Sequence, residues 1–193
     1  MKRRMLTLLL AVVLGYGSFD VIAANRPVRL TYTTEGRVSE PLCAYMDEYM
    51  AAIPPEAAHL LAAGGWRIVL TSEDIATRFG YDYDTIAGVT VESARTIFIS
   101  ASKTRIRRAL LHEVGHALGI LLGDPDAGAE FQRIYAAERE TFDQQEKIDD
   151  HCVSTAHEYF AEAYRHYVLY PDILRQSAPQ TYAYFQALFS EIS

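Results

Sequence analysis

The clearest pattern along the chain is an apolar stripe between Lys103 and about Leu122. Apolar side chains recur there every three or four residues, which places them on one face of a helix: Ile106, Ala109, Leu110, Val114, Ala117 and Leu118. Gly123, Asp124 and Pro125 follow, and these residue types end helices. The pattern therefore predicts a long amphipathic helix in the middle of the chain.

The residues before this helix show both strand and helix patterns. Strands are expected where apolar and polar residues alternate or form short apolar runs: around 28–32, 66–71, 86–91 and 95–100, the last two as a hairpin. Helices are expected over 39–53 and 56–63. A shorter helix is expected to end near Phe79 and to begin at a capping box formed by Thr71 and Asp74.

The residues after the long helix are expected to be mostly helical. The predicted helices cover Ala127 to about Arg139, Ser154 to Tyr170 and Pro179 to Ile192, whereas the polar stretch from Thr141 to Asp150 has no clear structure. Strands that precede a run of helices are typical of the α+β class. We therefore predict an α+β fold with a small mixed sheet followed by a helical C-terminal half.

The first 23 residues have the features of a signal peptide. Lys2-Arg3-Arg4 is basic, Met5–Leu14 is an apolar segment too short to span a bilayer, and Val21-Ile22-Ala23 offers a small-residue cleavage site. We expect cleavage after Ala23, with Ala24 as the second choice, and a single domain over 24–193. The protein is then expected to be secreted, to the exterior or to a periplasm or cell wall, with no integral membrane segment.

The charge of the chain restricts its partners. The net charge of −7 becomes −9 when the signal peptide, with three basic residues and one acidic one, is removed. An acidic domain without a Lys/Arg cluster argues against nucleic acid or an anionic membrane as a partner. We interpret Arg105-Ile106-Arg107-Arg108 as the solvated start of the long helix rather than as a binding patch, and we expect a monomer.

The two cysteines, Cys43 and Cys152, leave two alternatives open. Export to an oxidising compartment favours a disulfide that would tie an early helix to the segment before the last helices. Two unpaired thiols are equally consistent with the sequence, because the sequence does not give the separation of the two residues.

The strongest chemical signal is the motif His112-Glu113-Val114-Gly115-His116 on the long helix. Histidines at positions i and i+4 of a helix lie on the same face, so both imidazoles can bind one Zn²⁺ ion. Glu113 then lies beside the metal, where a general base for a metal-bound water is needed. The alternative is a buried amphipathic helix with two histidines satisfied by other groups, although burying these three side chains without a partner is costly.

The third zinc ligand must come from farther along the chain. The elongated motif that ends in a third histidine has Leu122 at that position, and Asp124 adjoins Pro125. The candidates are His151, His157, Glu158 and Glu162. We favour Glu158, because Glu162 lies one helical turn later and can accept the free N–H of a zinc-bound imidazole.

With these two motifs the chain resembles the catalytic domain of anthrax lethal factor and the secreted Pro-Pro endopeptidases, whose downstream helix has the form E-F-F-A-E-A-F. The matching segment here is Glu158-Tyr159-Phe160-Ala161-Glu162-Ala163-Tyr164. The resemblance implies a zincin-like metallopeptidase fold with zinc on His112, His116 and Glu158. It also implies Glu113 as the base and a supporting role for Glu162.

One position departs from the family pattern. The family usually has a tyrosine seven residues before the ligand glutamate, whose hydroxyl helps to stabilise the transition state, whereas this chain has His151 there. An imidazole that donates an N–H can stabilise an oxyanion in the same way. We therefore interpret His151 as a substitute for the tyrosine, the alternative being a solvent-exposed loop histidine.

Two further residues are candidate substrate contacts. The strand Thr96–Ile99, just before the long helix, would be a sheet edge to which an extended peptide adds, with Phe98 beside the cleft. Trp66 could also line the cleft, as an aromatic residue does in the Pro-Pro endopeptidases. For both residues the alternative is an ordinary core position.

These observations together predict a secreted zinc endopeptidase that cleaves an extended peptide or protein substrate, with a preference for Pro-rich sites implied only by the resemblance. A non-catalytic secreted zinc-binding module acting in adhesion or binding is the alternative from another functional class. A third interpretation keeps the enzyme but takes His151 or His157 as the ligand.

Overall fold

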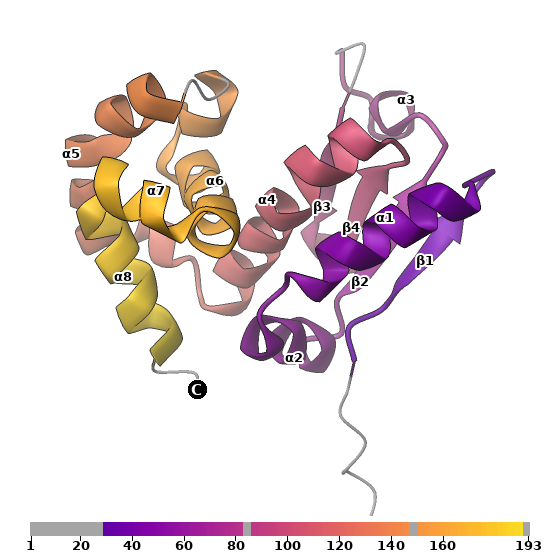
Figure 1. The fold of residues 1–193 in the computed structure, drawn as a ribbon, viewed down its shortest axis with the longest axis horizontal. Helices are drawn as coiled ribbons and strands as arrows, with labels where there is room; N and C mark the ends of the chain where they lie inside the picture. Colours follow the sequence, from indigo (N-terminus) through magenta and orange to yellow (C-terminus); the bar gives the residue numbers. More distant parts are fainter. Residues whose placement is uncertain (1–28, 83–85, 147–149, 191–193) are drawn as a thin grey trace, which may run out of the picture.

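The computed structural model describes residues 29–82, 86–146 and 150–190 (Figure 1). The predicted signal peptide lies outside these residues. The strands are β1 (Tyr32–Glu35), β2 (Arg67–Thr71), β3 (Gly88–Val91) and β4 (Thr96–Ser100). The α-helices are α1 (Glu40–Ala51), α2 (Pro55–Ala63), α3 (Ile75–Phe79), α4 (Lys103–Leu121), α5 (Ala129–Glu146), α6 (Ala156–Leu169), α7 (Pro171–Ser177) and α8 (Pro179–Ser190), and the 3₁₀ turns are η1 (Glu92–Ala94), η2 (Pro125–Ala127) and η3 (Asp150–Val153).

The four strands form one mixed sheet in the order β1-β2-β4-β3. β2 pairs with β1 and β4 in parallel, and β3 pairs with β4 in antiparallel orientation. Every residue of β4 is buried, as expected for a strand with a neighbour on each side. The prediction that β4 is the sheet edge beside the cleft is therefore wrong, and β3 occupies that edge.

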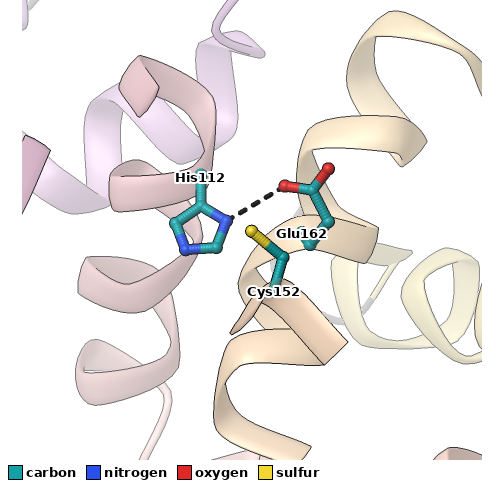
Figure 2. Close-up of side chains that lie close together, drawn as sticks. All are labelled: His112, Cys152 and Glu162. Atoms are coloured by element: carbon teal, nitrogen blue, oxygen red, sulfur yellow. Dashed lines mark hydrogen bonds and ion pairs between the residues drawn. The ribbon is translucent and has the colours of Figure 1, made fainter. Parts of the chain in front are cut away.

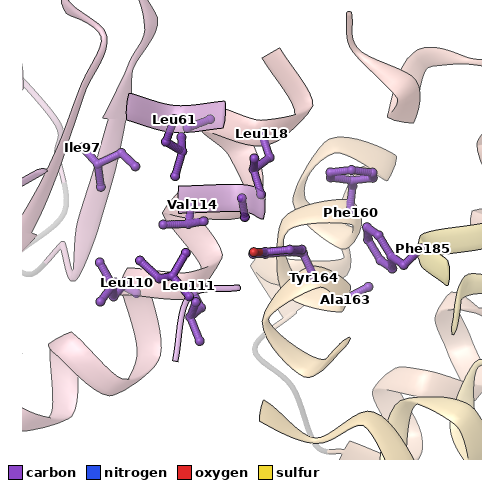
Figure 3. Close-up of a cluster of buried hydrophobic side chains, with 14 of the residues drawn as sticks. Leu61, Ile97, Leu110, Leu111, Val114, Leu118, Phe160, Ala163, Tyr164 and Phe185 are labelled. Atoms are coloured by element: carbon purple, nitrogen blue, oxygen red, sulfur yellow. The ribbon is translucent and has the colours of Figure 1, made fainter. Parts of the chain in front are cut away.

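Helix α4 lies between the sheet and the C-terminal helices (Figure 1). Its N-cap is Ser102, whose hydroxyl accepts a hydrogen bond from the backbone N–H of Arg105, and it ends before Gly123, whose φ is 78°. All residues from Ala109 to Gly119 are buried. The apolar ones join the sheet to the last helices in a single core (Figure 3), which includes Leu61, Ile97, Leu110, Val114, Phe160, Tyr164 and Phe185.

Helices α4 and α6 approach each other closely at Gly115. A Cβ atom added at Gly115 would lie 2.8 Å from Ala161 Cα and 3.0 Å from the Ala161 carbonyl oxygen. Both of these atoms belong to the backbone of α6, so neither can move without moving the helix. The absence of a side chain at position 115 therefore allows the two helices to pack with their backbones in contact.

The C-terminal half differs in detail from the sequence-based prediction. Helix α5 continues to Glu146 through residues expected to have no clear structure, because Phe142 is fully buried against Tyr159 and His166. Helix α7 was not expected as a separate element. Asp74, rather than Thr71, caps α3: its side chain accepts from the N–H of Ala76.

Two further expectations concern the membrane and the cysteines. No helix within the described residues has the length and apolarity needed to cross a bilayer. In the same part of the chain, Cys43 on α1 and Cys152 on η3 are not joined in a disulfide. This arrangement corresponds to the second of the two alternatives left open by the sequence.

The helix contact at Gly115 can be tested against a second glycine on the same helix. A Cβ at Gly119 would make only ordinary contacts, at 3.7 Å from Phe160 and 3.8 Å from Asp126. We predict that Gly115→Ala destabilises the protein by about 1–3 kcal/mol through overpacking. Gly119→Ala should leave stability unchanged or raise it by up to about 1 kcal/mol, because alanine favours helix. Urea unfolding of both variants measures the difference, and an equal effect on stability would contradict the close contact.

Candidate metal centre

Three side chains of the His-Glu-x-x-His motif point from α4 into one cleft. His112, Glu113 and His116 are each 8% exposed. They line a cleft of about 1630 Å³ whose walls also include β3, α6 and α7. The functional residues predicted on the long helix are thus buried in the protein but open to a common space.

Glu158 on α6 meets both histidines. Its Oε2 lies 3.1 Å from His112 Nε2 and 3.5 Å from His116 Nε2, and the two ring nitrogens are 3.2 Å apart. A tetrahedral zinc site with bonds of about 2.0–2.1 Å places its ligand atoms roughly 3.3 Å from one another. The three atoms therefore already stand at the separations that a zinc ion requires.

Glu162 supports the other side of His112. Its Oε2 lies 3.1 Å from His112 Nδ1 (Figure 2). Arg165 donates hydrogen bonds to both carboxylate oxygens of Glu162. Because one imidazole nitrogen faces Glu158 and the other faces Glu162, the ring is fixed in orientation. A carboxylate bonded to the second nitrogen of a ligand histidine is a recurring feature of zinc sites.

Glu113 faces the edge of the sheet. Its Oε2 accepts a hydrogen bond of 2.7 Å from the hydroxyl of Thr90 on β3. A Cβ at Gly88, on the same strand, would lie 2.8 Å from Glu113 Cγ. β3 thus gives Glu113 the room and one hydrogen bond to hold its carboxylate, and neither Gly88 nor Thr90 was singled out by sequence reasoning.

His151 lies on η3 at the border of the cleft. Its side chain is 72% exposed, and its Nε2 is 3.7 Å from Glu158 Oε2. It is therefore close to the ligand atoms but is not one of the three that converge. The adjacent Cys152 offers its sulfur near His112 and Glu162 as a second group of possible ligands (Figure 2), and no sequence motif pointed to this cysteine.

His157 has a different partner. Its Nδ1 lies 3.1 Å from Oδ2 of the buried Asp126, and its ring stacks on that of His116 at 4.3 Å. His157 is thus beside a ligand candidate rather than among the converging atoms. Asp126, on the turn after α4, was missed because a single acid near a helix end has no distinctive pattern.

The two predicted substrate contacts lie elsewhere. Trp66 is 4% exposed and belongs to the core. Phe98 on the central strand β4 is 8% exposed and packs against Phe79 and Arg78. Neither residue lines the cleft, so the structure does not bring them to the site.

A family model described as "Anthrax toxin lethal factor, N- and C-terminal domain" matches residues 71–188. This range is more than half of the chain and contains both halves of the metal centre. The chain belongs to this family.

A solved structure gives the fold of a relative. The Pro-Pro endopeptidase PPEP-2 from Paenibacillus alvei superposes with a TM-score of 0.65 and 23% sequence identity, over 82% of this chain and 97% of that one. The similarity establishes an α+β, zincin-like fold, as the sequence predicted. No curated protein sequence matches the chain.

In the metal-free centre, His112, Glu158 and Glu162 shift one another's pKa values. Burial alone would lower the pKa of His112, but hydrogen bonds to Glu158 and Glu162 outweigh it and raise that pKa to about 10. Burial raises the pKa of Glu162, yet His112 and Arg165 lower it overall to about 2. The pKa of Glu158 is likewise lowered by the two histidines against the effect of burial. Without a metal, a proton on His112 therefore provides the positive charge that the carboxylates require.

The residues present fit a zinc ion well. The donor set of two imidazoles and one carboxylate is that of known catalytic zinc sites, and its three ligand atoms stand at zinc-ligand separations. His112 also has the carboxylate partner on its second nitrogen that zinc-bound histidines usually have, whereas His116 Nδ1 has no hydrogen-bond partner within the described residues. The geometry and the chemistry of the donors thus agree.

We predict that His112 stays protonated at pH 8 in the metal-free protein and becomes neutral when zinc is added. Its folded pKa lies above the unfolded value near 6.5. Its contribution to stability is therefore fully present below pH 6.5 and lost as the pH rises through about 10. Long-range ¹⁵N NMR of the imidazoles measures the protonation directly. Glu162→Gln should lower the His112 pKa, and titration near 6.5 in the unmodified protein would contradict the network.

Proposed function

We propose that the protein is a secreted zinc-dependent endopeptidase. The observation that carries the proposal is the convergence of His112, His116 and Glu158 on one point, with Glu113 beside it in an open cleft. A purely structural zinc site is usually closed by four protein ligands and has no use for a neighbouring base. The membership of the lethal factor family supports the same conclusion.

Three atoms would hold the ion: His112 Nε2, His116 Nε2 and Glu158 Oε2. When bound, zinc lowers the pKa of a coordinated water and polarises the scissile carbonyl. Glu162 keeps His112 oriented through its Nδ1. Arg165 in turn holds the carboxylate of Glu162 in place.

Glu113 would act as the general base. Its carboxylate takes the proton from the attacking water and then gives it to the leaving amine. The Thr90 hydroxyl bonded to Oε2 fixes the carboxylate, leaving its other oxygen to receive the proton. His151 would donate an N–H to the oxyanion, and its position at the cleft border, 3.7 Å from Glu158, is compatible with that role.

The substrate would be an extended peptide or protein segment bound along β3. An edge strand offers unpaired backbone groups to which a peptide adds by main-chain hydrogen bonds. β3 is the edge of the sheet on the side of Glu113, and its residues line the cleft. The name of the Paenibacillus alvei relative makes Pro-Pro bonds the first sites to examine.

We expect the zinc-loaded protein to cleave members of a mixed peptide library that includes a Pro-Pro set. Glu113→Gln should keep its zinc and lose at least roughly a hundredfold in cleavage rate, because it removes the proton acceptor. Mass spectrometry of the digests identifies the cut sites. Cuts that persist in the Glu113→Gln protein would overturn the assignment of the base.

The same digest separates the two functional classes. If the zinc-loaded protein cuts nothing, the proposal of an endopeptidase fails for these substrates and the zinc-binding module gains support. Glu140→Gln provides a matched control, because this exposed glutamate lies on α5 and does not line the cleft. Its cleavage rate should equal that of the unmodified protein.

A further inference from the structure

One end of the cleft is basic. Arg105, Arg107 and Arg108, all in the first two turns of α4, line the cleft there, whereas Asp124 lines it beyond the other end of the same helix. The chain as a whole has a net charge of −7. The arginines therefore concentrate positive charge at one end of the cleft of an acidic protein.

This charge is unfavourable for the helix that carries it. The N-terminus of a helix has a partial positive charge and favours acidic residues. The first turn of α4 has no acidic residue. Four of the first six residues of the helix are basic: Lys103, Arg105, Arg107 and Arg108. Ion pairs within residues 29–82, 86–146 and 150–190 include neither Arg105 nor Arg107. Arg105 is attracted electrostatically to Asp74, the N-cap of α3. Within α4 itself, no acidic residue of the first turn offsets the positive charge of these side chains.

The same cleft collects the exposed apolar side chains. Among the described residues the large hydrophobic side chains that are exposed are Tyr81, Tyr170 and Ile173, at 43%, 38% and 40%. All three line the cleft. Exposed apolar groups gathered in one concave surface are typical of binding sites.

Tyr170 and Ile173 lie toward the basic end. On α6, Glu158 contacts His116 and the later Glu162 contacts the earlier His112. Because position increases along α6 while it decreases along α4, the two helices run antiparallel. The residues after Glu162 on α6 and α7 consequently flank the part of α4 that precedes His112. The basic and the apolar side chains therefore border the same part of the cleft.

The metal centre does not offset this charge. With zinc bound and His112 neutral, the charges of the ion and of Arg165 balance those of Glu113, Glu158 and Glu162. Among the residues that line the cleft, the arginines then remain as positive groups at its basic end, where they attract anionic groups.

We propose that the preferred substrates are peptides with acidic side chains next to an aromatic or aliphatic residue, on the side of the scissile bond that binds along the start of α4. This inference rests on the proposed endopeptidase function. It replaces the interpretation of Arg105-Ile106-Arg107-Arg108 as merely the solvated start of a helix.

The test compares the unmodified protein with the double variant Arg105→Glu/Arg107→Glu. The control is Arg133→Glu, an exposed arginine on α5 that does not line the cleft. The substrates are three versions of one cleaved peptide, with Asp, Ser or Lys at the positions flanking the cut. Acids favour a helix N-terminus, whereas Arg105→Glu also replaces an attraction to Asp74 by a repulsion. The melting temperature of the double variant is therefore measured first, to establish that the variant is folded before its kinetics are compared.

We expect the unmodified protein and the control to have the highest kcat/KM for the acidic peptide. In the double variant the ratio of acidic to basic kcat/KM should fall by at least about tenfold, because the attraction of a substrate carboxylate to two arginines becomes a repulsion by two glutamates. Raising the salt concentration should weaken the preference in the unmodified protein. Cleavage without any preference for the acidic peptide would overturn the inference while leaving the endopeptidase function intact.

Binding tests the inference independently of turnover. Fluorescence anisotropy can measure the affinity of zinc-loaded Glu113→Gln protein for the labelled acidic and basic peptides, with and without the two arginine substitutions. Tighter binding of the acidic peptide that is lost with the arginines supports the inference even if no cleavage is found. Equal affinities would overturn it.

Discussion

The backbone contact between α4 and α6 at Gly115 is the constraint on which the metal centre depends. It brings two glutamates of α6 within hydrogen-bond distance of one imidazole, so that Glu158 and Glu162 each face a nitrogen of His112. A side chain at position 115 would separate the helices and with them the ligand atoms. The glycine within the motif is thus a packing requirement of the site and not a neutral spacer.

The sheet and the last helices each contribute a part of the site that α4 alone lacks. β3 places Thr90 against the carboxylate of Glu113, while α6 supplies the ligand and the supporting carboxylate. The buried cluster needs a positive charge at its centre. A proton on His112 provides this charge in the metal-free protein, and the proposed zinc ion would provide it when bound. In the proposed function, metal binding would therefore replace a proton within a framework that is already assembled.

Sequence patterns predicted the centre of the site better than its borders. The helix that carries His112 and His116 and the choice of Glu158 depend on local spacing and on residue type, and the geometry brings these residues together. The edge of the sheet depends on the order of the strands, which spacing does not encode; β4 was therefore taken as the edge, with Phe98 beside the cleft. Gly88 and Asp126 acquire their roles only through contacts between distant segments, so no local pattern could reveal them.

We propose that Glu158 completes a single zinc site with the two histidines, whereas Glu162 only supports it. The most direct test is the zinc affinity of Glu158→Ala and Glu162→Ala, measured by competition with a chelator. Loss of a supporting carboxylate typically weakens binding by about 10–100-fold. We predict a loss in this range for Glu162→Ala and a larger one for Glu158→Ala, with one zinc per chain in the unmodified protein. Unchanged zinc affinity in Glu158→Ala would contradict the assignment of Glu158 as the third ligand.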